Sequence, residues 1–232
     1  MSELIPSLKK SLFDKTVDLS SDLLEIPIDA LIDNDIIKEI PVVGSIVKLG
    51  KAAVTIKEAH TIKKLVAFIE SVNNGDVEPD VLEKHKQMLE TNTKKLNSEL
   101  EMVLILVDRQ LEIEKTKILS ELYKAYISEK MAWSDFLYLS EILEKFFLRD
   151  VHALRVICEN GYVEKNDIDN KLSMFRLESI GLIQYFSRRN SSASTFSGEK
   201  EQNQMKATGY GKLLYECSLR KLINNGTIGE WI

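Results

Sequence analysis

From Asp80 to Asn160 the chain contains neither glycine nor proline. These two residues are the strongest breakers of regular structure, so nothing in this interval forces a helix to end. Apolar residues also recur every seven positions in its first part, at Leu82, Leu89, Leu96 and Val103. A stripe of this spacing predicts helices that pack on one another, as in a bundle or a hairpin.

One straight helix over residues 79–131 would be roughly 75 Å long. A compact domain favours a break in such a helix, and we expect it near Asp108-Arg109-Gln110, where polar residues follow an apolar run. That run, from Met102 to Val107, is apolar on all sides, which predicts that the middle of the helix is buried.

The composition is that of a globular protein with a sizeable core. The chain has 232 residues, of which 44% are hydrophobic and 29% are charged. Residues 1–133 hold 18 Lys and Arg against 23 Asp and Glu, and residues 134–232 hold 13 of each, so the formal net charge is −5. A dedicated nucleic-acid binder usually carries a basic excess, which this chain lacks in bulk.

We predict a mainly α protein with two domains. Residues 1–133 form a helical domain with long helices, in which a helix over residues 46–72 packs against the helices of residues 79–131. The residues before this helix break at Pro41 and Gly44. Residues 134–232 form a winged-helix-like domain with a small β-hairpin.

Lysines gather among apolar residues between Ile36 and Ile69, in a segment with acidic flanks. Two interpretations of this segment are open. The helix is buried against its neighbours with its lysines reaching outward, or it docks on an anionic membrane or a partner. When the helix is projected along its axis, lysines and apolar residues are mixed around it, which favours burial. Release of the helix by a trigger would restore the membrane hypothesis. The lysines that would make the contact are Lys48, Lys51, Lys57, Lys63 and Lys64.

The second domain begins with a helix that Ser134-Asp135 caps and that ends near Leu148. The serine-rich, polar stretch 188–203 predicts a mobile loop. Around it we expect helices over 150–159, 167–180 and 212–223 and strands over 184–187 and 204–207.

Two strings in this domain resemble parts of a winged helix. Arg176-Leu177-Glu178-Ser179-Ile180-Gly181-Leu182-Ile183 resembles the end of a recognition helix that runs into the first wing strand. Thr208-Gly209-Tyr210-Gly211-Lys212-Leu213-Leu214 resembles the exit from the wing into the final helix. There the resemblance implies a threonine that caps the helix and a glycine that permits close packing. It covers residues 134–223 and implies a fold, not a function.

A winged helix can bind DNA or protein. The candidate recognition helix, residues 165–180, carries three cations and three carboxylates, so its net charge is zero. DNA binding needs cations that neutralise phosphates. The candidates on this helix and on the wing are Lys171, Arg176, Arg188, Arg189 and Lys206. Without such binding, the domain is a protein-interaction module.

No residue pattern indicates catalysis, a metal or a cofactor. The three histidines, His60, His85 and His152, share no metal-ligand spacing with the two cysteines. We interpret Cys158 and Cys217 as small core residues, which suits a reducing compartment. The sequence therefore predicts no catalytic residues, no metal ligands and no cofactor.

The chain is expected to be cytoplasmic. Met1 is followed by a mixed polar stretch without the apolar core of a signal peptide. The longest uncharged stretch near Pro41 runs only from Ile40 to Val47, whereas a membrane span needs roughly 20 residues. Any membrane contact would therefore be peripheral.

The string Glu39-Ile40-Pro41-Val42-Val43-Gly44-Ser45-Ile46-Val47-Lys48, continued by His60-Thr61-Ile62-Lys63-Lys64-Leu65, resembles a class of bacterial proteins that includes the abortive-infection alpha group. The resemblance implies a role in defence against phage and supplies no catalytic residues. We therefore expect a non-enzymatic protein-interaction protein with a protein partner. The alternatives are a winged-helix DNA-binding regulator and a membrane-perturbing effector that acts through residues 36–69. The apolar stripe also fits a homodimer, although an intramolecular hairpin would use the same residues.

Overall fold

The computed structural model describes residues 3–14, 27, 30, 34–49, 55–74, 76–164, 171–188 and 202–228. The chain is mainly helical with one small antiparallel sheet, as the sequence predicts. It divides into two compact units, Met1–Ser140 and Glu141–Ile232. The division falls inside helix α9 (Trp133–Lys145), a little later than the boundary that we expected between residues 133 and 134.

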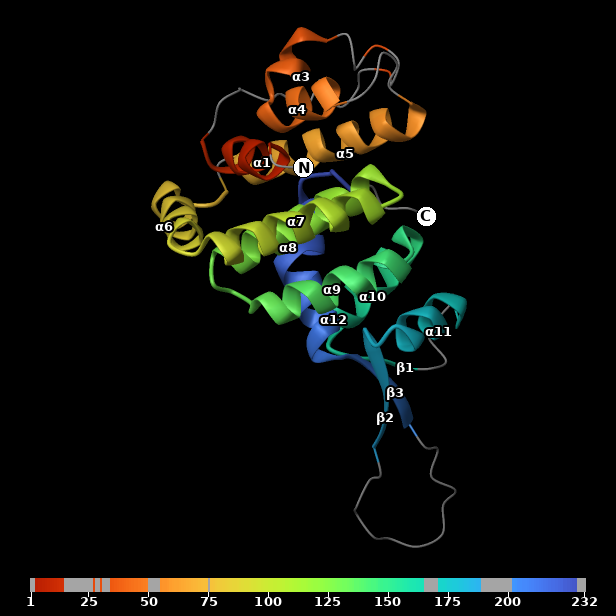
Figure 1. Ribbon diagram of the computed structural model, residues 1–232. Coiled ribbons are helices and arrows are strands. Elements are labelled where there is room, and N and C mark those ends of the chain that lie inside the picture. The colour runs from red at the N-terminus through yellow and green to blue at the C-terminus, as the bar shows by residue number, and fades with distance from the viewer. Residues whose placement is uncertain are drawn as a thin grey trace, which may run out of the picture. The chain divides into compact units, whose positions relative to one another are not determined.

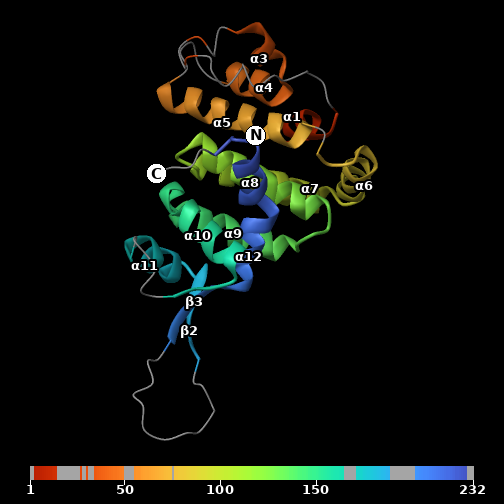
Figure 2. The same cartoon turned by 180° about the vertical axis from the view of Figure 1, so that it is seen from behind.

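Helix α5 lies in the middle of the first unit, as Figure 1 and the reverse view in Figure 2 show. It packs against α7 and α8 and also against α1, which in turn packs on α4. Among the described residues, the helices of this unit before α9 are α1 (Leu4–Phe13), α3 (Asp35–Glu39), α4 (Pro41–Leu49), α5 (Ile56–Asn73), α6 (Pro79–Glu90), α7 (Thr93–Arg109) and α8 (Ile113–Ile127).

The break expected at Pro41 is present, since α3 ends at Glu39 and α4 begins at Pro41, whereas the break expected at Gly44 is wrong. Pro41 is the first residue of α4, a position where the missing N–H of proline would have no helical partner anyway. Gly44 lies inside α4. A Cβ at Gly44 would lie 2.9 Å from the carbonyl oxygen of Lys38, so the close approach of the preceding helix favours glycine there.

The single helix expected over residues 46–72 is also wrong, because α4 ends at Leu49 and a new helix begins after Thr55. The Thr55 hydroxyl accepts a hydrogen bond from the N–H of Glu58, and the Glu58 carboxylate accepts one from the N–H of Thr55. This reciprocal cap satisfies donors that the first turn of a helix leaves free. It is the local reason that α5 begins where it does.

Residues 79–131 contain three helices. The break expected near Asp108-Arg109-Gln110 is present, since α7 ends at Arg109. A second break, which the sequence analysis did not foresee, separates α6 from α7. There the Asn92 side chain accepts a hydrogen bond from the N–H of Lys95 and caps α7.

Two buried lysines fasten α5 to its neighbours. Lys64, on α5, donates hydrogen bonds to the carbonyl oxygens of Asp108 at 2.5 Å and Gln110 at 2.8 Å, at the end of α7. Lys124, on α8, donates to the carbonyl oxygen of Ser71 at 2.9 Å, in the last turn of α5. Carbonyls at the end of a helix have no partner within it, and the helix dipole favours a cation there. Each lysine therefore caps one helix from another.

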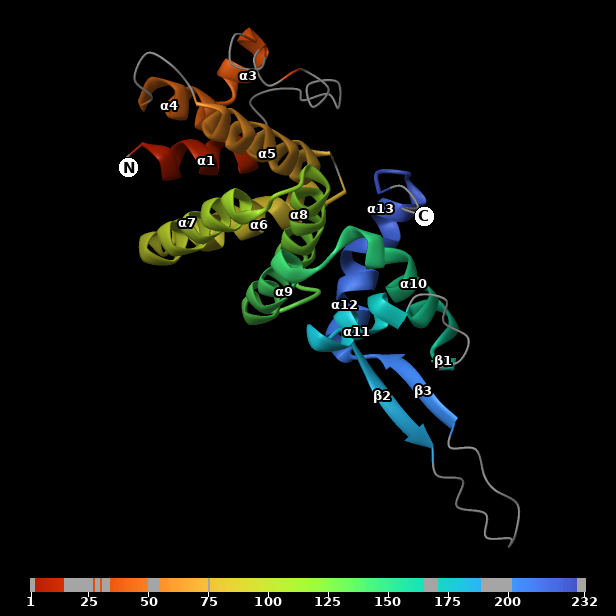
Figure 3. The ribbon, with the colours of Figure 1, turned by 90° about the vertical axis from the view of Figure 1, so that its right-hand side faces the viewer.

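The second unit contains a three-stranded antiparallel sheet in the order β1-β3-β2. The expected hairpin is present, with Tyr185 of β2 opposite Met205 of β3. Figure 3 shows β2 and β3 leading away from the helices of this unit. Its elements after α9 are η2 (Leu148–Asp150), α10 (Val151–Asn160), β1 (Val163–Glu164), α11 (Lys171–Ser179), β2 (Ile183–Arg188), β3 (Gln202–Ala207), α12 (Gly209–Leu214), the π-helical turn η3 (Tyr215–Leu219) and α13 (Arg220–Asn224).

Two of the elements expected from the sequence lie only partly within the described residues. The helix expected over 167–180 is seen as α11, and residues 167–170 lie outside the described residues. The loop expected over 188–203 likewise lies outside them, apart from its two ends.

The start of the final helix contacts the turn that follows α11. The Thr208 hydroxyl donates to the carbonyl oxygen of Gly181 at 2.7 Å and accepts from the N–H of Gly211 at 3.1 Å. A Cβ on Gly211 would lie 2.0 Å from the carbonyl oxygen of Leu182, so this contact requires glycine. Thr208 thus caps the final helix, and Gly211 packs closely against the backbone of Leu182.

Within the described residues, no helix has both the length and the apolar character that crossing a bilayer requires.

Candidate functional site

Helix α11 leaves two large apolar side chains in solvent. Its inner side buries Ser173, Met174 and Leu177, which lie at helical spacing. On its outer side, Leu172 is 61% exposed and Phe175 is 68% exposed. These two residues are three positions apart and are therefore neighbours on the helix surface.

Arg176, a candidate DNA contact, is engaged within the protein. Its Nε donates to Oδ2 of Asp150 at 2.7 Å, and its Nη2 donates to Oδ1 of the same carboxylate. Asp150 is only 1% exposed, and it also accepts a hydrogen bond from Ser173 at 2.6 Å. The hydrogen bonds to Asp150 raise the pKa of Arg176. The side chain therefore joins α11 to the start of α10.

The guanidinium of Arg176 also lies over the ring of Phe147, 5.2 Å from its centroid. Phe147 is itself exposed. Leu172 precedes Arg176 by one helical turn, so it shares this side of α11. We refer to Phe147, Leu172 and Phe175 as the α11 patch.

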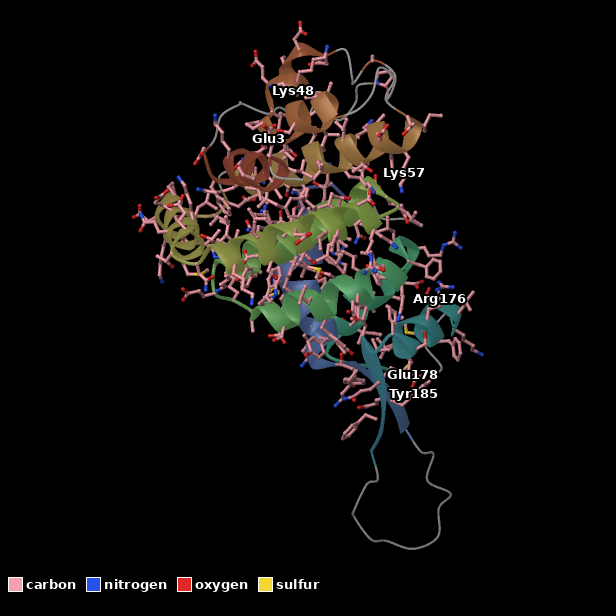
Figure 4. The ribbon with its side chains drawn as sticks, viewed as in Figure 1. Glu3, Lys48, Lys57, Arg176, Glu178 and Tyr185 are labelled. Carbon is pink, nitrogen blue, oxygen red and sulfur yellow. The ribbon has the colours of Figure 1, made fainter. Side chains whose placement is uncertain are left out.

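Among the described residues, the other candidate DNA contacts do not form a cationic face. Lys171 is exposed at the first residue of α11, and the carboxylate of Glu178 lies on the same helix. Figure 4 labels Arg176 and Glu178, which lie two positions apart and point in different directions. The ammonium of Lys206 lies 4.7 Å from the ring centroid of Phe186. The Arg188 side chain and all of Arg189 lie outside the described residues.

The lysines considered for membrane or partner contact differ in their exposure to solvent and in the helix that carries them. Lys48 and Lys57 are exposed and come from different helices (Figure 4). Lys63 is half-buried, and Lys51 lies outside the described residues. Lys64 is 3% exposed, and desolvation lowers its pKa. The expectation that Lys64 contacts a membrane or a partner is wrong for this conformation, because its ammonium turns inward to cap α7.

A buried carboxylate in the first unit gathers three hydrogen-bond donors. Glu99, on α7, is 3% exposed. Its Oε1 lies 2.8 Å from Nε2 of His85 and accepts from the Tyr123 hydroxyl at 3.0 Å. Its Oε2 accepts from the Tyr126 hydroxyl at 2.9 Å. The network joins α6, α7 and α8, so it fixes how these three helices pack.

The two phenols of this network stay protonated well into alkaline solution. Burial, and secondarily the negative charge of Glu99, raise the pKa of Tyr123 and of Tyr126. A phenol in this state donates a hydrogen bond and is not a base. The arrangement is therefore suited to holding a carboxylate acceptor in place, a binding and structural role.

A pocket of about 330 Å³ adjoins this network. The ring of Trp133, at the start of α9, lies 5.0 Å from the ring of Tyr126. Tyr126 thus contacts both Oε2 of Glu99 and the ring of Trp133. The pocket is lined by Asn92, Lys94, Lys95, Ser98, Glu99 and Trp133.

This site was not predicted from the sequence, although a signal was present. Leu82, Leu89 and Val103 belong to the apolar stripe. His85 follows Leu82 by three positions and Glu99 precedes Val103 by four, so both polar residues fall on the buried side of their helices. A polar residue at such a position needs a buried partner.

No group of three metal-ligating side chains comes together in the part of the chain that the structure describes. Cys158 and Cys217 are half-buried, so they lie at the margin of the core. Burial, with a smaller contribution from Glu216, raises the pKa of Cys158 to about 11. A thiol with this pKa is a poor nucleophile near neutral pH.

Comparison with known proteins gives no relative from which a role could be transferred: no family model matches the chain, and no curated protein or solved structure is significantly similar to it.

Proposed function

We propose that this chain is a non-enzymatic protein-interaction protein whose second unit binds a partner protein through the α11 patch. The observation that carries the proposal is the exposure of Leu172 and Phe175 on the outer side of α11. Large apolar side chains gathered at one place on a surface often mark a binding site, and aromatic residues are enriched in protein interfaces.

The charges around the patch support a protein partner over DNA. DNA binding requires cations that replace the counterions of the phosphates. On α11 the Arg176 guanidinium is already paired with Asp150, and Lys171 shares the helix with Glu178. An apolar helix surface with this charge balance suits an apolar counterpart.

The setting that we propose is phage defence of the abortive-infection kind, in the bacterial cytoplasm. Its support is the resemblance of residues 39–48 and 60–65 to that class of proteins. A second copy of the chain is one partner that the patch could take, and the test below identifies it.

Photo-crosslinking from inside the patch tests the proposal. A photoreactive phenylalanine analogue replaces Phe175 in the full chain, which is expressed in a bacterial host and irradiated before and during phage infection. We expect one discrete protein adduct, and an adduct of twice the chain mass would identify a homodimer. The matched control carries the analogue at Arg220, an exposed residue of the same unit outside the patch.

Protection of the host from phage is measured in parallel with a Leu172→Glu, Phe175→Glu variant. The proposal expects this variant to lose both the adduct and the protection while it keeps its circular dichroism spectrum and its thermal transition. Equal adducts from positions 175 and 220 would contradict the interaction through this surface. Salt-sensitive binding of duplex DNA that is lost with Lys171→Ala would favour the regulator. Binding to anionic liposomes that is lost with Lys48→Glu and Lys57→Glu would favour the membrane effector.

A further inference from the structure

The pocket beside Glu99 has the size and the chemistry of a small-molecule site. Its volume of about 330 Å³ lies at the lower end of the range for ligand pockets, roughly 300–1,000 Å³. It also adjoins residues whose pKa values are displaced by burial and by a charged neighbour, a combination that is frequent at functional sites.

The buried side of the pocket offers a hydrogen-bond acceptor. Oε1 of Glu99 has two partners, His85 and Tyr123, whereas Oε2 has one among the described residues, Tyr126. Each oxygen of a carboxylate can accept about two hydrogen bonds. Oε2 therefore keeps an acceptor position for an N–H or O–H group of a ligand in the pocket, which Glu99 and Trp133 both line.

The wall beside this acceptor is aromatic. Trp133 is half-buried, and its ring packs on Tyr126 at 5.0 Å, with an angle of 54° between the two planes. Tyr126 and Phe136, whose ring is stacked on the indole with centroids 5.0 Å apart, together orient it, and Trp133 forms part of the lining. An oriented, half-exposed indole is a platform on which a planar ring can stack.

The rim is cationic. Lys94 and Lys95 are exposed residues of the first turn of α7, and both contribute to the lining. The ammonium of Lys95 also donates to the sulfur of Met88 at 3.1 Å, a weak acceptor. Two lysines against the single carboxylate of Glu99 give the lining a positive balance, which favours a ligand with an anionic group.

We propose that this pocket binds a nucleotide. The base stacks on Trp133, an N–H on the edge of the base donates to Oε2 of Glu99, and the phosphate lies between Lys94 and Lys95. The lining favours a ligand with three features: a planar ring, an N–H donor at the edge of that ring, and an anionic group nearby. A nucleoside monophosphate combines them. The ligand has two sources, a free nucleotide and the end of a nucleic-acid strand.

The full chain with Trp231→Phe provides the assay. The chain has two tryptophans, and Trp231 lies outside the described residues, so this variant leaves Trp133 as the fluorophore. AMP, GMP and UMP are each titrated by Trp133 fluorescence, and binding is measured independently by calorimetry. We expect saturable quenching and heat with at least one of them, and weaker binding of adenosine and of inorganic phosphate. A trinucleotide that binds more tightly than its free mononucleotides would identify the end of a strand as the source.

Three variants connect binding to the site. Glu99→Gln keeps the shape of the side chain but removes its charge, and we expect about tenfold weaker binding. Trp133→Ala removes the stacking platform, and calorimetry should show a loss of about tenfold or more. The control is Glu101→Gln, an exposed carboxylate on the same helix, which should leave binding unchanged.

Thermal unfolding of each variant separates loss of binding from loss of fold. No saturable signal with any nucleotide on the folded chain would overturn the proposal. Equally tight binding of inorganic phosphate would overturn it too, because the base would then contribute nothing. Affinity that Glu99→Gln and Trp133→Ala both leave unchanged would place the nucleotide elsewhere and reject this pocket.

Discussion

Asp150 and Arg176 form a two-point ion pair that joins the start of α10 to α11, with Arg176 Nε 2.7 Å from Oδ2 of Asp150 and Nη2 bound to Oδ1. The aspartate is almost fully buried. The arginine that a winged-helix comparison would assign to DNA therefore has an internal partner, and its removal should affect stability first.

Arg176→Ala should destabilise the second unit, because it leaves the buried carboxylate of Asp150 without its cation. Breaking a fully buried pair costs about 3–5 kcal/mol. Since the Arg176 side chain is 19% exposed, we expect a smaller loss in the free energy of unfolding, about 2 kcal/mol. Urea denaturation of the two single variants and of Arg176→Ala with Asp150→Asn gives the coupling energy. A coupling below about 0.5 kcal/mol would show that the pair contributes nothing specific.

Gly211→Ala should disrupt the junction between the sheet and the final helix. A Cβ at Gly211 would lie 2.0 Å from the carbonyl oxygen of Leu182, and backbone on both sides cannot move aside cheaply. Overpacking of this kind costs about 3 kcal/mol or more. Gly209→Ala is the matched control, because no heavy atom lies within 4 Å of the added Cβ. Thermal unfolding should show a large drop for Gly211→Ala alone, and equal transitions for both variants would contradict the contact.

The elements that sequence reasoning found are those whose signals are local. The hairpin of β2 and β3 and the break after Arg109 were predicted within a residue or two. The end of α10 was predicted as well. Gly161, at the position after the last helical residue, has a φ of +77°, which lies in the left-handed region. Each of these rests on turn or cap chemistry that neighbouring residues alone determine.

The candidate sites were predicted less well because they depend on contacts between distant residues. A lysine on a helix is expected to reach outward, yet Lys64 turns inward, since the end of α7 presents carbonyl oxygens that lie beside α5 only in the folded chain. Glu99 was not recognised for the same reason. Its partners His85 and Tyr123 come from two other helices, and the sequence does not show which helices meet.

Lys64→Met tests whether this inward cap stabilises the first unit. The variant keeps an apolar stem of similar length but removes the donor from the carbonyl oxygens of Asp108 and Gln110. Leaving buried acceptors without partners should lower the free energy of unfolding by about 2 kcal/mol. Lys57→Met, at an exposed position of the same helix, should change it by less than about 0.5 kcal/mol. Equal effects in chemical denaturation would mean that the cap has no energetic role.

Cys158 should react slowly with iodoacetamide near neutral pH, because burial raises the pKa of its thiol to about 11 and only the thiolate is nucleophilic. In a Cys217→Ser chain, the alkylation rate should keep rising with pH up to about 11. The unfolded chain in urea should instead level off near the ordinary thiol value of 9.0. The same plateau in the folded chain would show that Cys158 is more accessible to solvent than the structure indicates.

Alkaline solution should weaken the second unit through Tyr215. Its hydroxyl donates to Oε1 of Glu159 at 2.5 Å, and burial, followed by Glu159, raises its pKa from 10.0 to about 12. The folded state therefore holds the phenolic proton more tightly than the unfolded state does. The resulting stability is complete below pH 10.0 and is lost as the pH rises toward about 12.

Within that window, the free energy of unfolding should fall by about 1.4 kcal/mol per pH unit for this one group. Tyr215→Phe should remove that part of the slope, whereas Tyr162→Phe, at an exposed tyrosine of the same unit, should leave it unchanged. Urea unfolding followed by circular dichroism at several alkaline pH values gives the slope, and absorbance near 295 nm reports phenolate formation. A slope that Tyr215→Phe does not alter would mean that the phenol titrates alike in both states, and that the hydrogen bond to Glu159 does not hold its proton.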